Sequence, residues 1–156
     1  MTRAGVLERD GRLCAQIWTE LPEAVRRRTA LLPVSETGAG HWDVLTAAPD
    51  PGRLPEVRLS CRVLLVPGQL CWLTDRVSSV WAVSYGFSSR DTLTLSSLTE
   101  TRLEASLQRE LVTLTGTRIE RQEFLLTRAP GTTPLETLAY LGTALLLGVP
   151  PEWFQS

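Results

Sequence analysis

The segment from Pro134 to Leu147 is almost entirely apolar, and it constrains the fold more than any other feature of the chain. Thr133 and Glu136 have the spacing of a capping box, with proline at the first helical position, so a helix is predicted to begin here. Gly148 ends it. A surface helix has a polar face, and this one has hardly any, so either the rest of the domain or a second subunit must cover it. At 14 residues it is too short to span a bilayer.

Composition and charge are those of an ordinary globular protein. The 156 residues are 43% hydrophobic and 21% charged, which fits one domain spanning residues 1–156. A net charge of −1 provides no overall attraction to nucleic acid or to an anionic membrane. All 16 basic residues are arginine, and lysine and asparagine are absent, a bias typical of a GC-rich bacterial genome.

The amino-terminal residues and the cysteines predict a reduced, cytoplasmic and soluble protein. Residues 1–10 contain no continuous apolar stretch like that of a signal peptide. Cys14, Cys61 and Cys71 are too few for a secreted disulfide framework and include no CxxC pair, so we expect three free thiols. One histidine and dispersed cysteines do not have metal-ligand spacing, and we expect neither a metal nor another cofactor.

Much of the chain carries the alternating pattern of short β-strands. Asp10-Gly11 is typical of a two-residue turn, which predicts an N-terminal hairpin over residues 6–18. Pro67-Gly68 predicts a second tight turn. A four-strand meander follows from the alternation, with strands at residues 57–65, 70–74, 80–85 and 92–95. A late strand over residues 118–127 is charged on both faces, which is typical of a protected sheet edge.

Two further helices are expected, over residues 22–32 and residues 101–115. Residues 33–56 lack periodicity and hold four of the ten prolines, which predicts a long, mobile loop. Because strands joined by hairpins run antiparallel, we expect the α+β class. The N-terminal hairpin, the meander and the late strand would form a mostly antiparallel sheet, packed by two or three helices that include the apolar C-terminal one.

The most suggestive polar grouping consists of Arg58, Arg62 and Asp75. If Pro67-Gly68 closes a hairpin, Ser60 pairs with Asp75, and Arg62 lies one step diagonally from that aspartate. Two arginines four residues apart on a strand are about 13 Å apart at Cα, far enough to hold both ends of a small dicarboxylate. The alternative is a solvent-facing arginine–aspartate pair, which stabilises little.

No motif identifies catalytic residues; this favours a protein that is not an enzyme but leaves the question open. His41, the only histidine, is a candidate general base, because this side chain suits that role near neutral pH, but nothing marks a nucleophile beside it. The phosphate-binding patterns GxGxxG and GxxxxGK[ST] are absent, as is the hydrolase pattern GxSxG. The run Arg26-Arg27-Arg28 is a weak case for nucleic acid on a nearly neutral protein.

One segment resembles a known family: Arg62-Val63-Leu64-Leu65-Val66-Pro67-Gly68-Gln69-Leu70-Cys71-Trp72 is similar to the central hairpin of chorismate lyases. A strand arginine holds the substrate in that family, so the resemblance implies this role for Arg62. The acidic residue that the family carries on its last strand has no match in residues 124–128, and the family does not end in an apolar helix. The chain is not assigned to it.

Two hypotheses on function follow from these patterns. The preferred one is a non-catalytic binding, assembly or chaperone-like module that acts through protein–protein contacts. Trp153 and Phe154 are its candidate partner-binding residues, and the partner is another protein or a second copy in a homodimer. The alternative is a protein, of lyase or isomerase type if it is an enzyme, that binds a small carboxylate-bearing anion in an enclosed pocket between sheet and helices. Arg58, Arg62, Asp75 and His41 would serve that pocket.

Overall fold

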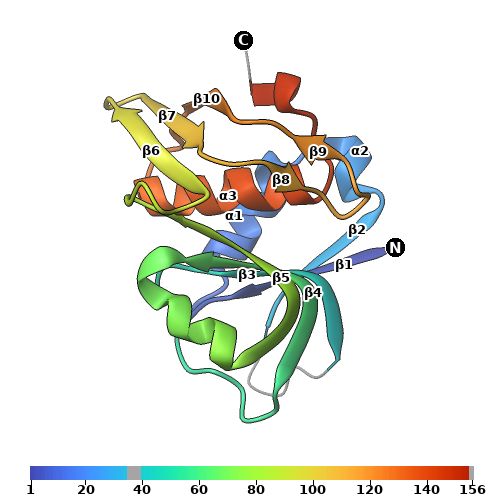
Figure 1. Ribbon diagram of the computed structural model, residues 1–156. Coiled ribbons are helices and arrows are strands. Elements are labelled where there is room, and N and C mark those ends of the chain that lie inside the picture. Colours follow the sequence, from blue (N-terminus) through green and yellow to red (C-terminus); the bar gives the residue numbers. More distant parts are fainter. Residues whose placement is uncertain (35–39, 155–156) are drawn as a thin grey trace.

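The computed structural model describes residues 1–34 and 40–154 (Figure 1). The strands are β1 (Thr2–Leu7), β2 (Thr29–Pro33), β3 (His41–Ala47), β4 (Leu59–Pro67), β5 (Val77–Gly86), β6 (Leu93–Leu98), β7 (Arg102–Leu107), β8 (Leu111–Val112), β9 (Arg118–Ile119) and β10 (Gln122–Thr127). The α-helices are α1 (Arg12–Glu20), α2 (Glu23–Arg26) and α3 (Pro134–Leu146), and two 3-10 helices are η1 (Gly68–Asp75) and η2 (Pro151–Phe154). No helix in the described part of the chain is long and apolar enough to cross a membrane.

Eight strands form one sheet in the order β10-β7-β6-β5-β4-β3-β1-β2, and β8 pairs with β9 in a separate hairpin. The five pairs from β2 to β6 are parallel, whereas β6–β7 and β7–β10 are antiparallel. The α+β class is therefore confirmed, but the mostly antiparallel sheet was wrong: this sheet is mixed and mostly parallel. Alternation of apolar and polar residues along a strand does not report the direction of its neighbour.

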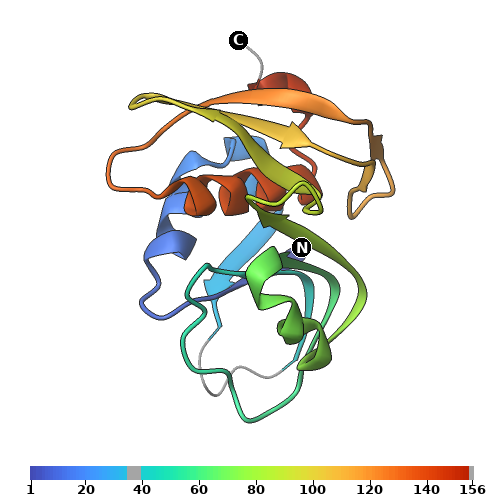
Figure 2. The ribbon, with the colours of Figure 1, turned by 60° about the vertical axis from the view of Figure 1, so that its left-hand side comes forward.

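Helix α3 runs through the middle of the molecule and is covered by its own chain. The antiparallel strands lie on one side of it and the parallel strands on the other, so the sheet curls around the helix (Figure 2). Every residue from Glu136 to Leu146 is buried. The expected capping box is present, since the Thr133 hydroxyl accepts from the Glu136 amide and the Glu136 carboxylate accepts from the Thr133 amide. A Cβ at Gly142 would come within 2.7 Å of Leu65, so the helix lies directly against β4.

The expected N-terminal hairpin was wrong, because residues 12–20 form helix α1. Its buried residues are Leu13, Cys14 and Ile17, a helical spacing rather than the alternation that the hairpin required. Gly11 has a φ of 78°, so the Asp10-Gly11 pair does turn the chain, but into a helix. Parallel β1 and β2 need such a crossover, which a two-residue turn cannot supply.

The second expected turn was also wrong. After Pro67 the chain enters η1, which covers residues 70–74, and returns as β5, parallel to β4. The hairpin on which the chorismate lyase resemblance rested is thus absent. Strands near 80–85 and 92–95 are confirmed as parts of β5 and β6.

Two expected helices and the expected loop differ from the structure. Residues 101–115 contain β7 and β8, because Leu103, Ala105 and Leu107 are buried in alternation. Within residues 22–32, only the short α2 is helical, and β2 follows it. The stretch 33–56 is not a loop throughout, since it contains β3, whose residues pair with β1 and β4. Residues 35–39 of this stretch lie outside the described residues.

Candidate functional site

The polar residues singled out in the sequence do not form one cluster. Because β4 and β5 are parallel, Ser60 pairs with Ser78 and not with Asp75. The Arg62 guanidinium donates to the Leu114 carbonyl oxygen at 3.3 Å, which ties β4 to the β8–β9 hairpin. Among the described residues, no ion pair joins Arg58 or Arg62 to Asp75.

Arg58 and His41 lie near the amino-terminal ends of the central strands. Arg58 lines a hollow of about 210 Å³ together with Arg76 and Glu56. His41 begins β3, and its Nδ1 lies 3.1 Å from the Ser60 hydroxyl on β4. The structure therefore places His41 beside a serine, at an exposed position on the sheet.

The carboxyl ends of the parallel strands form a second region of interest. In the parallel part of the sheet, β2-β1-β3-β4-β5, the chain builds outward from β1 to β2 on one side and from β3 to β5 on the other. Ligands of open α/β sheets bind at the carboxyl ends of the strands, outside the point where the strand order reverses in this way, here between β1 and β3. A hollow of about 250 Å³ lies there, between the segment after β1 and the segment after β3. Its polar lining residues are Glu8, Arg9, Asp10, Arg12, Asp50, Thr133 and Glu136.

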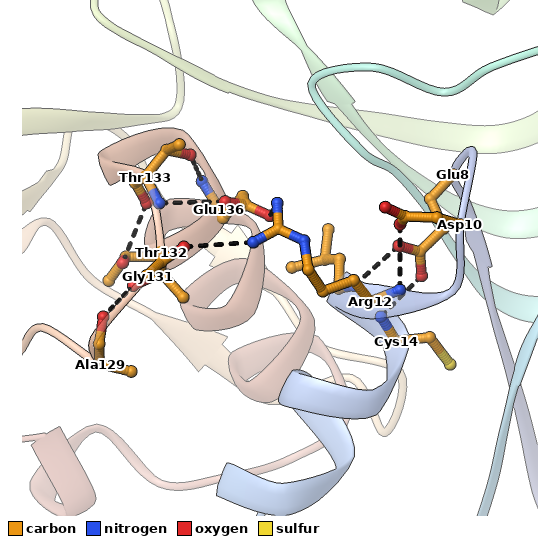
Figure 3. A network of polar contacts seen from close by, with 11 residues as sticks. Glu8, Asp10, Arg12, Cys14, Ala129, Gly131, Thr132, Thr133 and Glu136 are labelled. Atoms are coloured by element: carbon orange, nitrogen blue, oxygen red, sulfur yellow. Dashed lines mark hydrogen bonds and ion pairs between the residues drawn. The ribbon is translucent and has the colours of Figure 1, made fainter.

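The chain's own carboxylates occupy the start of α1 in this hollow (Figure 3). Glu8 accepts hydrogen bonds from the Leu13 and Cys14 amides, both at 2.7 Å, and Asp10 accepts from the Arg12 amide at 3.1 Å. Burial raises the pKa of Glu8, although these two amide hydrogen bonds act in the opposite direction. Since the amides that hold a phosphate in nucleotide-binding folds are engaged here, this helix start is not arranged to bind an anion.

Arg12 joins the start of α1 to the start of α3 (Figure 3). Its Nη2 lies 2.9 Å from Oε2 of Glu136, and its Nη1 donates to the Gly131 carbonyl oxygen at 3.1 Å. Glu136 is only 7% exposed, so the ion pair and the capping box together satisfy a nearly buried carboxylate. This network holds two helices in place, and Glu136 borders both the hollow just described and a larger one.

The larger hollow, of about 500 Å³, is called the C-terminal groove below. It lies between α1, the first turns of α3, the end of β10 and η2. Its main lining residues are Leu13, Gln16 and Glu20 of α1, residues 125–130, Thr137 and Tyr140 of α3, and Trp153 and Phe154 of η2. The volume is within the range of sites that hold drug-sized ligands or short peptide segments.

The two candidate partner-binding residues have different surroundings in this groove. Phe154 is buried and packs edge-to-face against Phe124 and Tyr140, with ring centroids 6.1 and 6.0 Å away. Trp153 is 56% exposed and stands at the rim. A side-chain hydrogen bond nevertheless joins Trp153 to the Tyr140 hydroxyl. Phe154 therefore anchors η2 to the core, whereas Trp153 keeps more than half of its surface exposed at the rim despite its bond to Tyr140.

Three residues that line the groove carry polar groups of note, namely Tyr140, Glu20 and Arg128. The Tyr140 hydroxyl donates to the Glu20 carbonyl oxygen at 3.1 Å, and burial raises the pKa of Tyr140 to about 12. Burial also raises the pKa of the Glu20 carboxyl, against a hydrogen bond with Gln16. Arg128 donates from Nη1 to the Thr99 carbonyl oxygen at 2.8 Å, while its buried Nε has no hydrogen-bond partner in the described part of the chain.

Sequence reasoning found Trp153 and Phe154 but missed the rest of the groove. Gln16 and Glu20 share a face only because residues 12–20 are helical, and the hairpin interpretation separated them. The end of β10 borders the groove only because the sheet curls around α3. The weak sequence clue was the charge-free stretch Phe124–Thr127 within an otherwise charged segment.

The remaining side chains to consider are the potential metal ligands and the cysteines. Within residues 1–34 and 40–154, no group of three or more His, Cys, Asp or Glu side chains could hold a metal ion. Burial raises the pKa of Cys14 to about 11 and that of Cys61 to about 12, so both stay protonated thiols at neutral pH. Cys71 is exposed. No protein-family model matches the chain, and no curated protein matches it either.

Proposed function

We propose that this chain is a non-catalytic binding module that holds a segment of another polypeptide in the C-terminal groove. The observation that carries the proposal is the placement of Trp153, a large aromatic side chain that is 56% exposed beside an open hollow of about 500 Å³. Tryptophan is enriched among residues that dominate binding energy, because one side chain buries much apolar area and keeps a polar N–H.

The groove favours holding a ligand over proton transfer. Glu136 is engaged in the ion pair with Arg12, and the Tyr140 pKa of about 12 keeps its hydroxyl protonated at neutral pH. Glu20 is the remaining carboxylate in the lining, and its neighbour there is the amide of Gln16. The lining thus offers apolar surface and hydrogen-bonding groups that are already engaged with the protein's own residues.

A displayed library of random twelve-residue peptides tests the proposal and does not require the natural partner to be identified first. Peptides enriched on the wild-type protein are measured against Trp153→Ala and against Trp72→Ala. Trp72 is a matched control, because it is 47% exposed on η1 and does not line the groove. We expect Trp153→Ala to weaken binding about tenfold or more and Trp72→Ala to leave it unchanged, as for a central aromatic contact.

Four other outcomes have clear meanings. Failure to enrich any peptide, or equal binding to both tryptophan variants, refutes the groove as a polypeptide-binding site. A homodimer that dissociates in the Trp153→Ala variant, measured by native mass spectrometry, would make a second copy the occupant instead. A small molecule that copurifies with the protein and is lost from that variant would replace the polypeptide with a different ligand.

A second candidate function has one specific observation in its favour. Arg58 and Arg76 line the same hollow of about 210 Å³, which is an arrangement suited to a small carboxylate-bearing anion. Glu56 shares that lining and opposes anion binding. Calorimetric titration with a series of dicarboxylates tests this candidate: binding to the wild type that is lost in Arg58→Ala and kept in Arg90→Ala would support it.

A further inference from the structure

Strand β10 is the last strand of the sheet, and its outer edge has no strand partner in the described part of the chain. Arg128 donates its amide to the Thr101 carbonyl oxygen at 2.8 Å, which extends the β10–β7 register by one pair. Along two antiparallel strands, residues that lie directly opposite each other alternate: one pair exchanges two backbone hydrogen bonds, and the next pair exchanges none. Phe124 and Leu126 therefore bond to β7, whereas the N–H and C=O groups of Leu125 and Thr127 point to the free edge.

The free edge of β10 is also a wall of the C-terminal groove. The last three residues of β10, Leu125, Leu126 and Thr127, line the hollow together with residues 128–130 that follow the strand. Successive side chains of a strand point to opposite faces, so a hollow that meets all three strand residues must reach the backbone edge itself. The unpaired backbone groups of Leu125 and Thr127 are thus available to a molecule in the groove.

The shape of the groove restricts what can pair with this edge. Residues of α1, α3 and η2 line it together with β10 and enclose the space beside this edge. A second folded sheet would need space for the helices that pack on it as well as for its edge strand. A single extended segment needs only the width of one strand, about 4.8 Å. We propose that the occupant is an extended peptide segment that joins β10 as a ninth strand of the sheet, a mode that rests on the binding function proposed above.

The groove also specifies one side chain of this segment. Inward-pointing residues of an added strand would enter a groove that is lined by Leu126, Leu13 and Glu20. Arg128 lines the groove but is bonded to the Thr99 carbonyl oxygen, and Arg12, outside the lining, is paired with Glu136, so neither compensates Glu20. An arginine or lysine of the segment fits here, because its aliphatic stem can cover the leucines while its charge reaches the carboxylate.

Proline substitutions separate strand addition from docking of side chains alone. Thr127→Pro removes one outward N–H and leaves the bonds to β7, and proline is tolerated on edge strands where the N–H faces outward. Glu123→Pro is the matched control: it removes an outward N–H from the same strand at a position that does not line the groove. We expect library-selected peptides to bind Thr127→Pro at least tenfold more weakly and Glu123→Pro as tightly as wild type.

Amide hydrogen exchange on the wild-type protein provides a second measurement that needs no variant. A selected peptide should slow exchange at Leu125 and Thr127 together and leave Leu126, already bonded to β7, unchanged. Peptides that depend on Trp153 yet neither protect these two amides nor respond to Thr127→Pro would overturn strand addition and leave the binding function in place. If no peptide binds the wild type, both proposals fail.

Glu20→Gln tests the basic side chain. We expect the selected peptides to share an arginine or lysine, and Glu20→Gln to weaken them about tenfold. The same peptides with that residue replaced by methionine should bind wild type and Glu20→Gln equally, because the partner charge is gone. Selected peptides without a common basic residue would refute this assignment, while strand addition is decided separately by the exchange of Leu125 and Thr127.

Discussion

The buried pair Thr46–Thr143 offers a sharp test of how α3 is held against the sheet. Both residues are fully buried, and their hydroxyl oxygens lie 2.7 Å apart. The Thr143 hydroxyl donates to the Ala139 carbonyl oxygen, also at 2.7 Å. A hydroxyl has one proton to donate, so Thr46 must be the donor to Thr143.

This direction predicts unequal costs for two isosteric substitutions. Thr143→Val leaves the Thr46 hydroxyl buried without an acceptor, a loss of about 2 kcal/mol. Thr46→Val removes that donor, but Thr143 keeps its bond to Ala139, so the cost is about 1 kcal/mol. The double variant leaves no orphaned hydroxyl and should cost about 1 kcal/mol, well below the sum of the single changes.

Urea denaturation of the wild type, the two single variants and the double variant measures these differences in free energy of unfolding, provided the slope of free energy against urea concentration stays constant. The expected coupling energy between the two positions is about 2 kcal/mol. If Thr46→Val costs as much as Thr143→Val, or if the two costs add in the double variant, the hydrogen-bond direction deduced here is wrong.

Three further predictions concern the groove and its surroundings. Arg12→Ala should lower the free energy of unfolding by about 1–2 kcal/mol in urea, because it leaves the 7%-exposed Glu136 carboxylate without its cation. Phe154→Ala should cost about 3 kcal/mol, whereas Trp153→Ala should cost under about 1 kcal/mol, since one ring is in the core and the other is at the rim. Because burial raises the pKa of Glu20 above its ordinary 4.5, the folded state holds that proton more tightly. Stability should fall as pH rises through the raised value, and Glu20→Gln should reduce that fall in denaturation curves collected from pH 4 to 7.

Local sequence patterns predicted an element correctly where the pattern fits either a helix or a strand but not both. The capping box at Thr133 and the apolar residues after it define α3, because both act within one turn of the chain. Three of the strands, β4, β5 and β6, were found from alternation of their residues. The charged segment before Phe124 predicted a sheet edge, and β10 is one.

Where a pattern fits both a helix and a strand, only tertiary packing decided which of the two forms. Leu103 and Leu107 are four residues apart, which matches one face of a helix as well as one face of a strand. Their burial against α3 from a strand that pairs with β6 and β10 decides the question. Leu13 and Ile17 have the same ambiguity, and there the crossover between parallel β1 and β2 requires a helix.

The sequence by itself determined that an apolar helix near the C-terminus had to be covered, because burial of its side chains follows from their chemistry. The tertiary structure alone decided that the cover comes from a sheet that curls around it. It also decided that Glu20, Thr127 and Trp153 meet at one groove. Strand direction and partner depend on hydrogen bonds between residues far apart in the chain, and no local pattern of side chains records them.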